Sequence, residues 1–389
     1  MSTAQATNPI SAKRHTSATA GLFFVNGLVF SNWLPRIPEV RDRLGVSNGG
    51  LGTALIGGGL GGLIGSFVVA KVLVKFGSRR TVICAAALLA CGLPLIAIVP
   101  SPLALAALLT ALGFLDVNTD VAMNAQGVMA QTNLGRSIMN RLHGGWSLGS
   151  VTGAGIGSLA SAAHISLGIH LSVVAAAQLA TIAIVRKSLV KIDPPQPAAP
   201  HNASPKRLSP TVVAMAMMAL GIAWLEITPS DWSAVAMRDV FSAGRLTGVA
   251  TVVFAGMMLV GRLGGDHVLN RIGSERILSA ALSVSVLGAA VVVTAPTTTV
   301  ALIGFGIWGL GVSVLFPQLY TMAATLPGTA AGAGLGAMAV GQRLGFMVSA
   351  PAIGAIADWR NLRWSFTAAA VGALALALAT RRILHPNRP

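Results

Sequence analysis

Two aspartates four residues apart in a long apolar segment form the pattern with the most chemical potential in this chain. Asp116 and Asp120 stand at i and i+4, and Asn124 follows one turn later, so a helix would place all three on one face. Ionisable groups inside a membrane span cost about 2.5–3.5 kcal/mol each and are therefore functional candidates by default. A desolvated carboxyl beside a second carboxylate can exchange a proton near neutral pH. We expect Asp120 and Asp116 to bind protons; the alternative is a structural carboxylate bonded to backbone or amide groups.

Two further ionisable residues interrupt apolar segments near their middles. Arg343 lies about 13 residues into one such segment, and its guanidinium stays charged there, so it needs a carboxylate partner or an anionic ligand. Asp120, Asp116 and Glu226 are its candidate partners, and a side chain reaching out to the membrane surface is the alternative. Glu226 precedes Pro229, which removes a backbone donor and is expected to interrupt the helix. We expect Glu226 and Arg343 to bind solute, with an interfacial acid as the alternative for Glu226.

Uncharged polar residues in the same segments extend this candidate site. Asn124, Asn32 and Gln318 are the amides that we expect to contact a solute. His143 is expected to make a capping or inter-helix hydrogen bond, with a proton relay as the alternative. For Asp231 we favour a contact near a helix end.

The composition shows which elements must position these residues. The 389-residue chain is 54% hydrophobic and only 10% charged, against about 25% charged in soluble domains, so the bilayer is its solvent. A helical span needs roughly 20 apolar residues. We therefore predict an all-α polytopic membrane protein with twelve spans, at 18–35, 48–70, 81–99, 102–127, 143–162, 165–185, 211–235, 246–265, 276–295, 298–320, 330–356 and 364–380.

The positions of the basic residues predict the orientation. Of the 27 Lys and Arg residues, 19 fall in segments that are inside when the N-terminus is inside, and 7 fall in outside segments. The net charge of +16 is therefore a topology signal, and we expect no nucleic-acid partner. The predicted parts are a cytoplasmic tail (1–17), a six-helix bundle (18–185), a polar cytoplasmic linker rich in Pro (186–210), a second bundle (211–380) and a cytoplasmic tail (381–389).

A short repeat relates the two predicted bundles. The hexamer 75–80 reads Lys-Phe-Gly-Ser-Arg-Arg and the hexamer 271–276 reads Arg-Ile-Gly-Ser-Glu-Arg, each after the second span of its half. The offset of 196 residues also pairs Gly113 with Gly309, Gly149 with Gly345 and Ala154 with Ala350. Two parallel six-span repeats around a central site are an established transporter architecture.

Several phrases resemble the major facilitator superfamily, and within it the bacterial branch related to fucose:proton symporters. They are Asp120-Val-Ala-Met-Asn-Ala-Gln126, Arg141-Leu-His-Gly-Gly-Trp-Ser-Leu-Gly149, Asp231-Trp-Ser-Ala-Val235 and Gly261-Arg-Leu-Gly-Gly-Asp266. The resemblance covers essentially the whole chain and implies two pseudo-symmetric six-helix bundles that carry a small solute. We expect a monomer in the bacterial cytoplasmic (inner) membrane, with the solute, protons and the lipid bilayer as partners.

The chain departs from the family pattern in ways that bear on gating and substrate. In the loop after the second span, Lys75, Gly77, Arg79 and Arg80 match the family motif, but Val74 stands at the position of its acid. We therefore expect the second-half residues Arg262, Asp266 and Arg271 to share the gating role. The antiporter-type motif of span 5 lacks its proline, which weakens an efflux function. Span 1 lacks the acid of fucose symporters, so sugar specificity is not implied.

The favoured function is secondary active transport of a small solute, either sugar-like or an organic anion. Proton-coupled symport by alternating access is preferred, and a proton-driven efflux antiporter for drugs or metabolites is the alternative. We expect no enzyme, because the sequence contains no His-Glu-x-x-His and no paired catalytic aspartate motif. A Walker sequence is absent, so ATP does not drive transport directly. Cys84 and Cys91 form no metal or disulfide pattern, and we expect neither metal nor cofactor.

Overall fold

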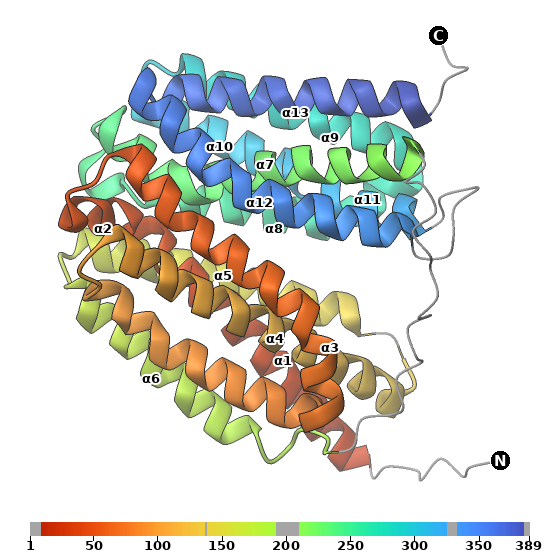
Figure 1. Ribbon diagram of the computed structural model, residues 1–389. Coiled ribbons are helices and arrows are strands. Elements are labelled where there is room, and N and C mark those ends of the chain that lie inside the picture. Colours follow the sequence, from red (N-terminus) through yellow and green to blue (C-terminus); the bar gives the residue numbers. More distant parts are fainter. Residues whose placement is uncertain (1–8, 137, 192–209, 325–332, 385–389) are drawn as a thin grey trace.

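The computed structural model describes residues 9–136, 138–191, 210–324 and 333–384, and these ranges contain helices and no strand (Figure 1). The first half comprises α1 (Pro9–Ser31), η1 (Leu34–Arg36), α2 (Ile37–Leu44), α3 (Asn48–Gly92), η2 (Leu93–Ala97), α4 (Pro102–Leu134), α5 (Met139–Ala162) and α6 (Leu167–Val185). The second half comprises α7 (Pro210–Asp239), η3 (Gly244–Leu246), α8 (Val249–Ile272), α9 (Ser274–Thr294), α10 (Thr298–Val312), α11 (Leu315–Ala324), α12 (Ala333–Trp359) and α13 (Leu362–Leu384). Most of the predicted linker, residues 192–209, lies outside the described ranges.

The described part of each of the twelve predicted spans coincides with a helical stretch, and the all-α membrane fold is confirmed. Within the described ranges, seven helical segments are long and apolar enough to cross a membrane. Helix α1 begins at Pro9, within the segment predicted to be a polar tail, and ends at Ser31. The short helix α2 follows it and buries Ile37, Pro38 and Val40.

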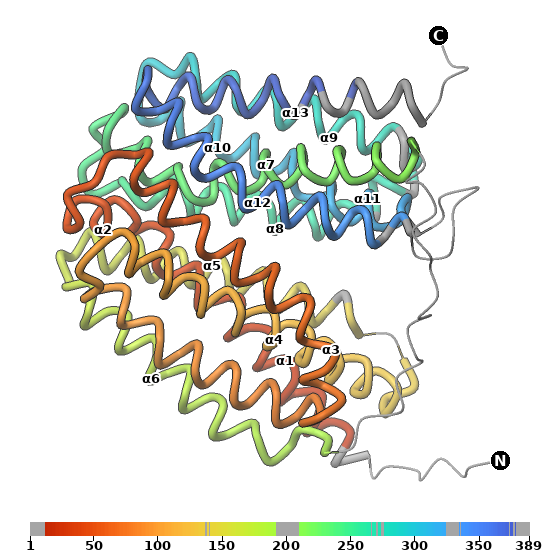
Figure 2. Tube along the Cα trace, viewed as in Figure 1, coloured from red at the N-terminus to blue at the C-terminus, as the bar shows by residue number. Residues whose placement is uncertain are grey.

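Each half packs mainly on itself, and the halves meet along two pairs of helices. In the first half α3 packs on α4 and α1 packs on α5; in the second half α12 packs on α7 and α9 packs on α10. Between the halves, α3 contacts α12 and α5 contacts α8. The end of the molecule that holds α2, the end of α7 and the α12–α13 turn is called the α2 end, and the opposite end is called the Gly77 end. Figure 2 shows the halves close together at the α2 end and diverging toward the Gly77 end.

The repeated hexamers adopt the same backbone conformation. Gly77 has φ 75° and ψ 158° and separates the two predicted spans that are merged in α3. Gly273 has φ 81° and ψ 162° and separates α8 from α9. This region of backbone space is essentially restricted to glycine. The hexamer repeat therefore marks a structural repeat, a sharp turn that each half needs between its second and third spans.

Replacing Gly273 by Ala should lower the thermal stability of the purified protein, because a side chain at this φ and ψ costs about 1–3 kcal/mol. Gly264→Ala is the matched control. It lies in the middle of α8, and a Cβ there, like one at Gly273, meets nothing within 4 Å. Helical alanine is favoured over glycine, so this control should leave the melting temperature unchanged or higher. Equal effects of the two substitutions in a thermal unfolding assay would show that the turn does not require glycine.

Close helix contacts repeat with the same offset of 196 residues. A Cβ at Gly149 would collide with the carbonyl oxygen of Phe24, and a Cβ at Gly345 would collide with that of Leu220, which is Phe24 shifted by 196 positions. These glycines let α5 approach α1, and α12 approach α7, at backbone distance. Likewise, a Cβ at Gly113 would collide with the carbonyl oxygen of Gly58, and a Cβ at Gly309 would collide with that of Phe254, which is Gly58 shifted by 196 positions. The two halves thus share their internal packing.

Two prolines act differently on their helices. Pro317 has no N–H to donate to the carbonyl of Ser313, and the predicted tenth span is divided there into α10 and α11. Helix α7, by contrast, continues through Pro229, so the interruption expected after Glu226 is not found. Beside this proline, the Thr228 hydroxyl donates to the carbonyl of Trp224, and the Ser230 hydroxyl donates to that of Glu226. Such side-chain hydrogen bonds help a membrane helix to tolerate proline.

Candidate functional site

The two aspartates of α4 lie inside the membrane-spanning part of the first half, and each has an amide partner from that half. Asn26 of α1 donates from Nδ2 to Asp116 Oδ1 over 3.5 Å, and Trp146 of α5 in turn donates to Asn26 Oδ1 over 2.9 Å. Asn124 donates from Nδ2 to Asp120 Oδ1 over 3.1 Å. The predicted shared face of α4 therefore exists, and Asn124 contacts Asp120 along it.

Arg343 extends toward these aspartates from the second half. A Cβ placed on Gly62 of α3 would lie 3.0 Å from Arg343 Nη1 and 3.6 Å from Val117 Cγ2, so the guanidinium of α12 lies against α3 and α4. Its charge acts on both Asp116 and Asp120. Among the described residues, however, no carboxylate lies within the 4.0 Å of an ion pair with Arg343. The structure thus brings together residues 227 and 223 positions apart in the chain without pairing them.

Glu226 is matched with a different arginine. Arg262 of α8 lies 3.8 Å from Glu226 Oε1 and donates to the hydroxyl of Ser147 on α5 over 3.2 Å. The other carboxylate oxygen, Oε2, is buried without a hydrogen-bond partner in the described ranges. Arg262 was predicted to act in gating near a loop. Its side chain bridges the two halves through Ser147, and its gating role stays a prediction. The sequence signal for its position was its place inside the predicted eighth span.

Two more titratable side chains complete this group. His143 of α5 lies within range of the charges of both Asp120 and Arg262. Tyr320 of α11 is within range of the charges of Arg343, Asp120 and Glu226, and its hydroxyl donates to Gln342 Oε1 over 3.1 Å. We call the following residues the membrane charge cluster: Asp116, Asp120, His143, Glu226, Arg262, Tyr320 and Arg343. Sequence reasoning missed Tyr320, although it is the only tyrosine in the chain.

The remaining predicted solute contacts lie in packed surroundings. Asn32 is fully buried; its Oδ1 lies 3.0 Å from His170 Nε2, and its Nδ2 donates to the carbonyl of Leu28. Gln318 of α11 is 5% exposed, and its Oε1 has no hydrogen-bond partner among the described residues. No group of three His, Cys, Asp or Glu side chains in the described part of the chain could hold a metal ion.

The predicted gating motif occupies the Gly77 end. Lys75 and Arg80 are exposed on α3, and Arg79 donates twice to the carbonyl of Arg186, just after α6, over 3.0 and 2.8 Å. This contact ties Arg79 to its own half. Arg271 is exposed at the end of α8, and the side chain of Asp266 lies outside the described part of the structure.

The α2 end is held by contacts between the halves that sequence reasoning did not anticipate. Arg41 of α2 pairs with Asp239 of α7, and Arg238 pairs with Asp42 over 2.5 Å. The Asp358 carboxylate, at the end of α12, accepts hydrogen bonds at the start of α3. Its donors are the Ser47 hydroxyl (2.6 Å), Asn48 N (3.0 Å) and Gly49 N (2.8 Å). We call these interactions the α2 latch. Two Arg-Asp dipeptides, 41–42 and 238–239, were the available sequence signal.

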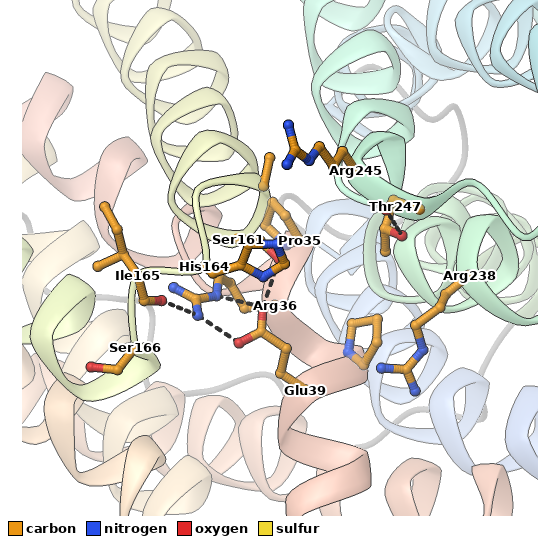
Figure 3. Close-up of a pocket in the computed structure, with 13 residues that line it drawn as sticks. Pro35, Arg36, Glu39, Ser161, His164, Ile165, Ser166, Arg238, Arg245 and Thr247 are labelled. Carbon is orange, nitrogen blue, oxygen red and sulfur yellow. Dashed lines mark hydrogen bonds and ion pairs between the residues drawn. The ribbon is translucent and has the colours of Figure 1, made fainter.

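A pocket of about 350 Å³ lies beside the latch and is lined by both halves (Figure 3). In its wall Arg36, only 2% exposed, donates to both Glu39 oxygens over 2.8 and 2.5 Å and to the carbonyl of Ile165 over 2.7 Å. The Ser161 hydroxyl also donates to Glu39, over 2.6 Å. The Arg36–Glu39 pair is therefore fully bonded within the first half, and this pocket is separate from the membrane charge cluster.

A family model, sequence relatives and solved structures show what this chain is similar to. The model of the Major Facilitator Superfamily matches residues 19–345. An uncharacterised MFS-type transporter of Yersinia pestis is 27% identical over 366 residues, which cover 93% of this chain and 94% of that protein. The crystal structure of the nucleoside transporter NupG superposes with a TM-score of 0.75 at 14% identity, covering 96% and 100% of the two chains. A bacterial homologue of the human lysosomal transporter Spinster, crystallised inward-facing and unoccupied, gives 0.76 at 11% identity over 98% and 99%. At these identities the two structures show the fold alone.

Proposed function

The chain belongs to the major facilitator superfamily, and we propose that it carries a small solute together with a proton by alternating access. It is a multi-pass membrane transporter and not an enzyme. One observation carries the symport proposal: the two aspartates of α4 belong to the first half, and Arg343 of the second half lies against Gly62 of α3, within range for its charge to act on both carboxylates. Protonation of either carboxylate therefore changes the attraction between the halves, which is the link that proton coupling requires.

The α2 latch supports a proposal about the conformational state. Ion pairs and hydrogen bonds join the halves at the α2 end, whereas the ribbons diverge toward the Gly77 end (Figure 1). The excess of Lys and Arg in the predicted inside segments supports a cytoplasmic Gly77 end. The described state is then inward-facing, in the cytoplasmic membrane of a bacterium. A cysteine at Thr299, exposed at the α2 end, should react with an impermeant maleimide added to whole cells; protection there would reverse this orientation.

The symport proposal is tested by uptake into proteoliposomes. The purified protein is screened with sugars, organic anions and drugs at two external pH values against a fixed internal pH. We expect one class of solute to accumulate when the outside is acidic, and to equilibrate without accumulating when the pH values are equal. Accumulation driven by the opposite gradient would favour the efflux antiporter. Accumulation independent of the pH gradient would exclude proton coupling in either direction.

A further inference from the structure

Arg343 is positioned to hold a ligand between the two halves. It extends from α12 of the second half and lies against Gly62 of the first, where any Cβ would be only 3.0 Å from Nη1. The absence of a side chain at Gly62 thus provides the space that the guanidinium occupies. A ligand bound to Arg343 at this boundary would lie beside both α3 and α12, one of the two helix pairs that join the halves.

The acids around Arg343 have other partners: an amide at hydrogen-bond distance for each aspartate, and an ion pair for Glu226. Asp116 accepts from Asn26, Asp120 accepts from Asn124, and Glu226 lies beside Arg262. Within the described residues Arg343 is left without a carboxylate inside 4.0 Å, whereas Arg262 has one. A guanidinium remains charged at any physiological pH, and an unpaired one within a membrane is costly. The second half therefore presents, at the boundary between the halves, a guanidinium that no described carboxylate contacts directly.

We infer that the transported solute is an organic anion, and that Arg343 binds its oxyanion group. This inference rests on the proposed function and narrows it from small solutes in general to anions. The planar fork of N–H donors matches a carboxylate or phosphate in a bidentate geometry. Tyr320, 44% exposed and bonded to Gln342 next to Arg343, offers an aromatic surface beside the same site.

The charges of the cluster connect anion binding to the proton. Three acids and two arginines give the ionised cluster a net charge of −1, so an entering anion is repelled until a carboxyl accepts a proton. Anion affinity should therefore rise as the pH falls. The titratable and charged groups that face Arg343 or its neighbours are Asp116 and Asp120 on α4, His143 on α5, Glu226 on α7, Arg262 on α8 and Tyr320 on α11.

The test uses pairs of probes that share a scaffold and differ in charge. Thermal stabilisation and binding by calorimetry are measured on the full-length protein with glucuronate, glucose 6-phosphate and glucose, and with nicotinate and nicotinamide. We expect at least one anion to bind and to stabilise the protein, and its neutral counterpart to show no binding. Arg343→Gln should weaken that anion about 30-fold or more, since loss of one partner of a buried charge pair costs about 2 kcal/mol or more. The anion affinity of Arg343→Lys should lie between those of the wild type and Arg343→Gln. Arg245→Gln, at an exposed arginine of η3, should bind the anion with wild-type affinity.

Several results would overturn the inference. Binding of the neutral member as tightly as the anion, unchanged affinity in Arg343→Gln, or no stabilisation by any anion would each do so. Arg343→Lys keeps the charge and checks that a loss in Arg343→Gln is not simply misfolding. Uptake of the bound anion then separates the two proposals. An anion held by Arg343 but carried without protons would remove only the symport proposal, whereas proton-driven uptake of a neutral solute would remove only the anion inference.

Discussion

Replacing Asp120 by Asn should abolish accumulation driven by a proton gradient. The asparagine oxygen can still accept the hydrogen bond from Asn124 Nδ2, so the local packing on α4 is kept. The amide cannot bind a proton, however, so the gradient has no site through which to act. A gradient of one pH unit is worth about 1.4 kcal/mol, or tenfold accumulation per proton carried. We expect this tenfold accumulation to fall to simple equilibration, while exchange of labelled for unlabelled solute persists.

The control for this experiment is another carboxyl group within the membrane. Asp231 lies in α7 and outside the membrane charge cluster. Asp231→Asn should accumulate solute like the wild type. Asp116→Asn tests the neighbouring acid, and loss of accumulation there with normal accumulation in Asp120→Asn would move the proton site to Asp116. Unchanged acid-driven uptake in both variants would remove the α4 aspartates from the coupling mechanism.

Replacing Asp358 by Ala should shift the protein toward a state that is open at the α2 end. The carboxylate of Asp358 caps the first turn of α3 from the other half, so its three hydrogen bonds exist only while this end is closed. Loss of a helix cap costs about 0.5–2 kcal/mol. Because that energy is lost from the closed state alone, the open population should rise by roughly two- to thirtyfold. Spin labels at Ala163 and Thr299, with Cys84 and Cys91 replaced by Ser, would report the longer distance by pulsed electron paramagnetic resonance.

Two further variants make the latch experiment specific. Asn361→Ala is the matched control, because Asn361 accepts a hydrogen bond from Trp364 N within the second half and should leave the distance distribution unchanged. Asp239→Lys sets a like charge against Arg41, so it should also open the α2 end, and Arg41→Glu in the same chain should close it again. An Asp358→Ala protein with the wild-type distance distribution would show that the latch does not set the conformational equilibrium.

The sequence was sufficient for the fold because the signals of a membrane protein are local. Apolar runs of spanning length located the helices, and the glycine of each hexamer located the turn that only glycine can make at Gly77 and Gly273. The offset of 196 residues predicted which glycines correspond, and their packing partners obey the same offset. The boundaries were less predictable, since α1 continues to Pro9 and Pro317, unlike Pro229, interrupts its helix.

The candidate site was only partly visible in the sequence. Its charged residues stood out because ionisable groups are rare in apolar segments, and Asp116, Asp120, Glu226 and Arg343 do gather in one cluster. Which acid lies beside which arginine could not be predicted from the sequence, because it depends on how far side chains extend across the boundary between the two halves. Glu226 lies beside Arg262, and Arg343 pairs with no described acid. The sequence alone left the three acids as alternative partners of Arg343.

By itself the sequence determined that the chain lies in a lipid bilayer, where its helices are, that its halves repeat, and which charged residues lie in the membrane. The tertiary structure alone decided which charges are compensated and which end of the molecule is closed. Arg41 and Asp239 are 198 residues apart, and Ser47 and Asp358 are 311 apart, so no local pattern reports their contacts. Such contacts arise from the relative placement of two similar bundles. Periodicity specifies each bundle, whereas their relative placement depends on complementary surfaces that only the folded chain brings together.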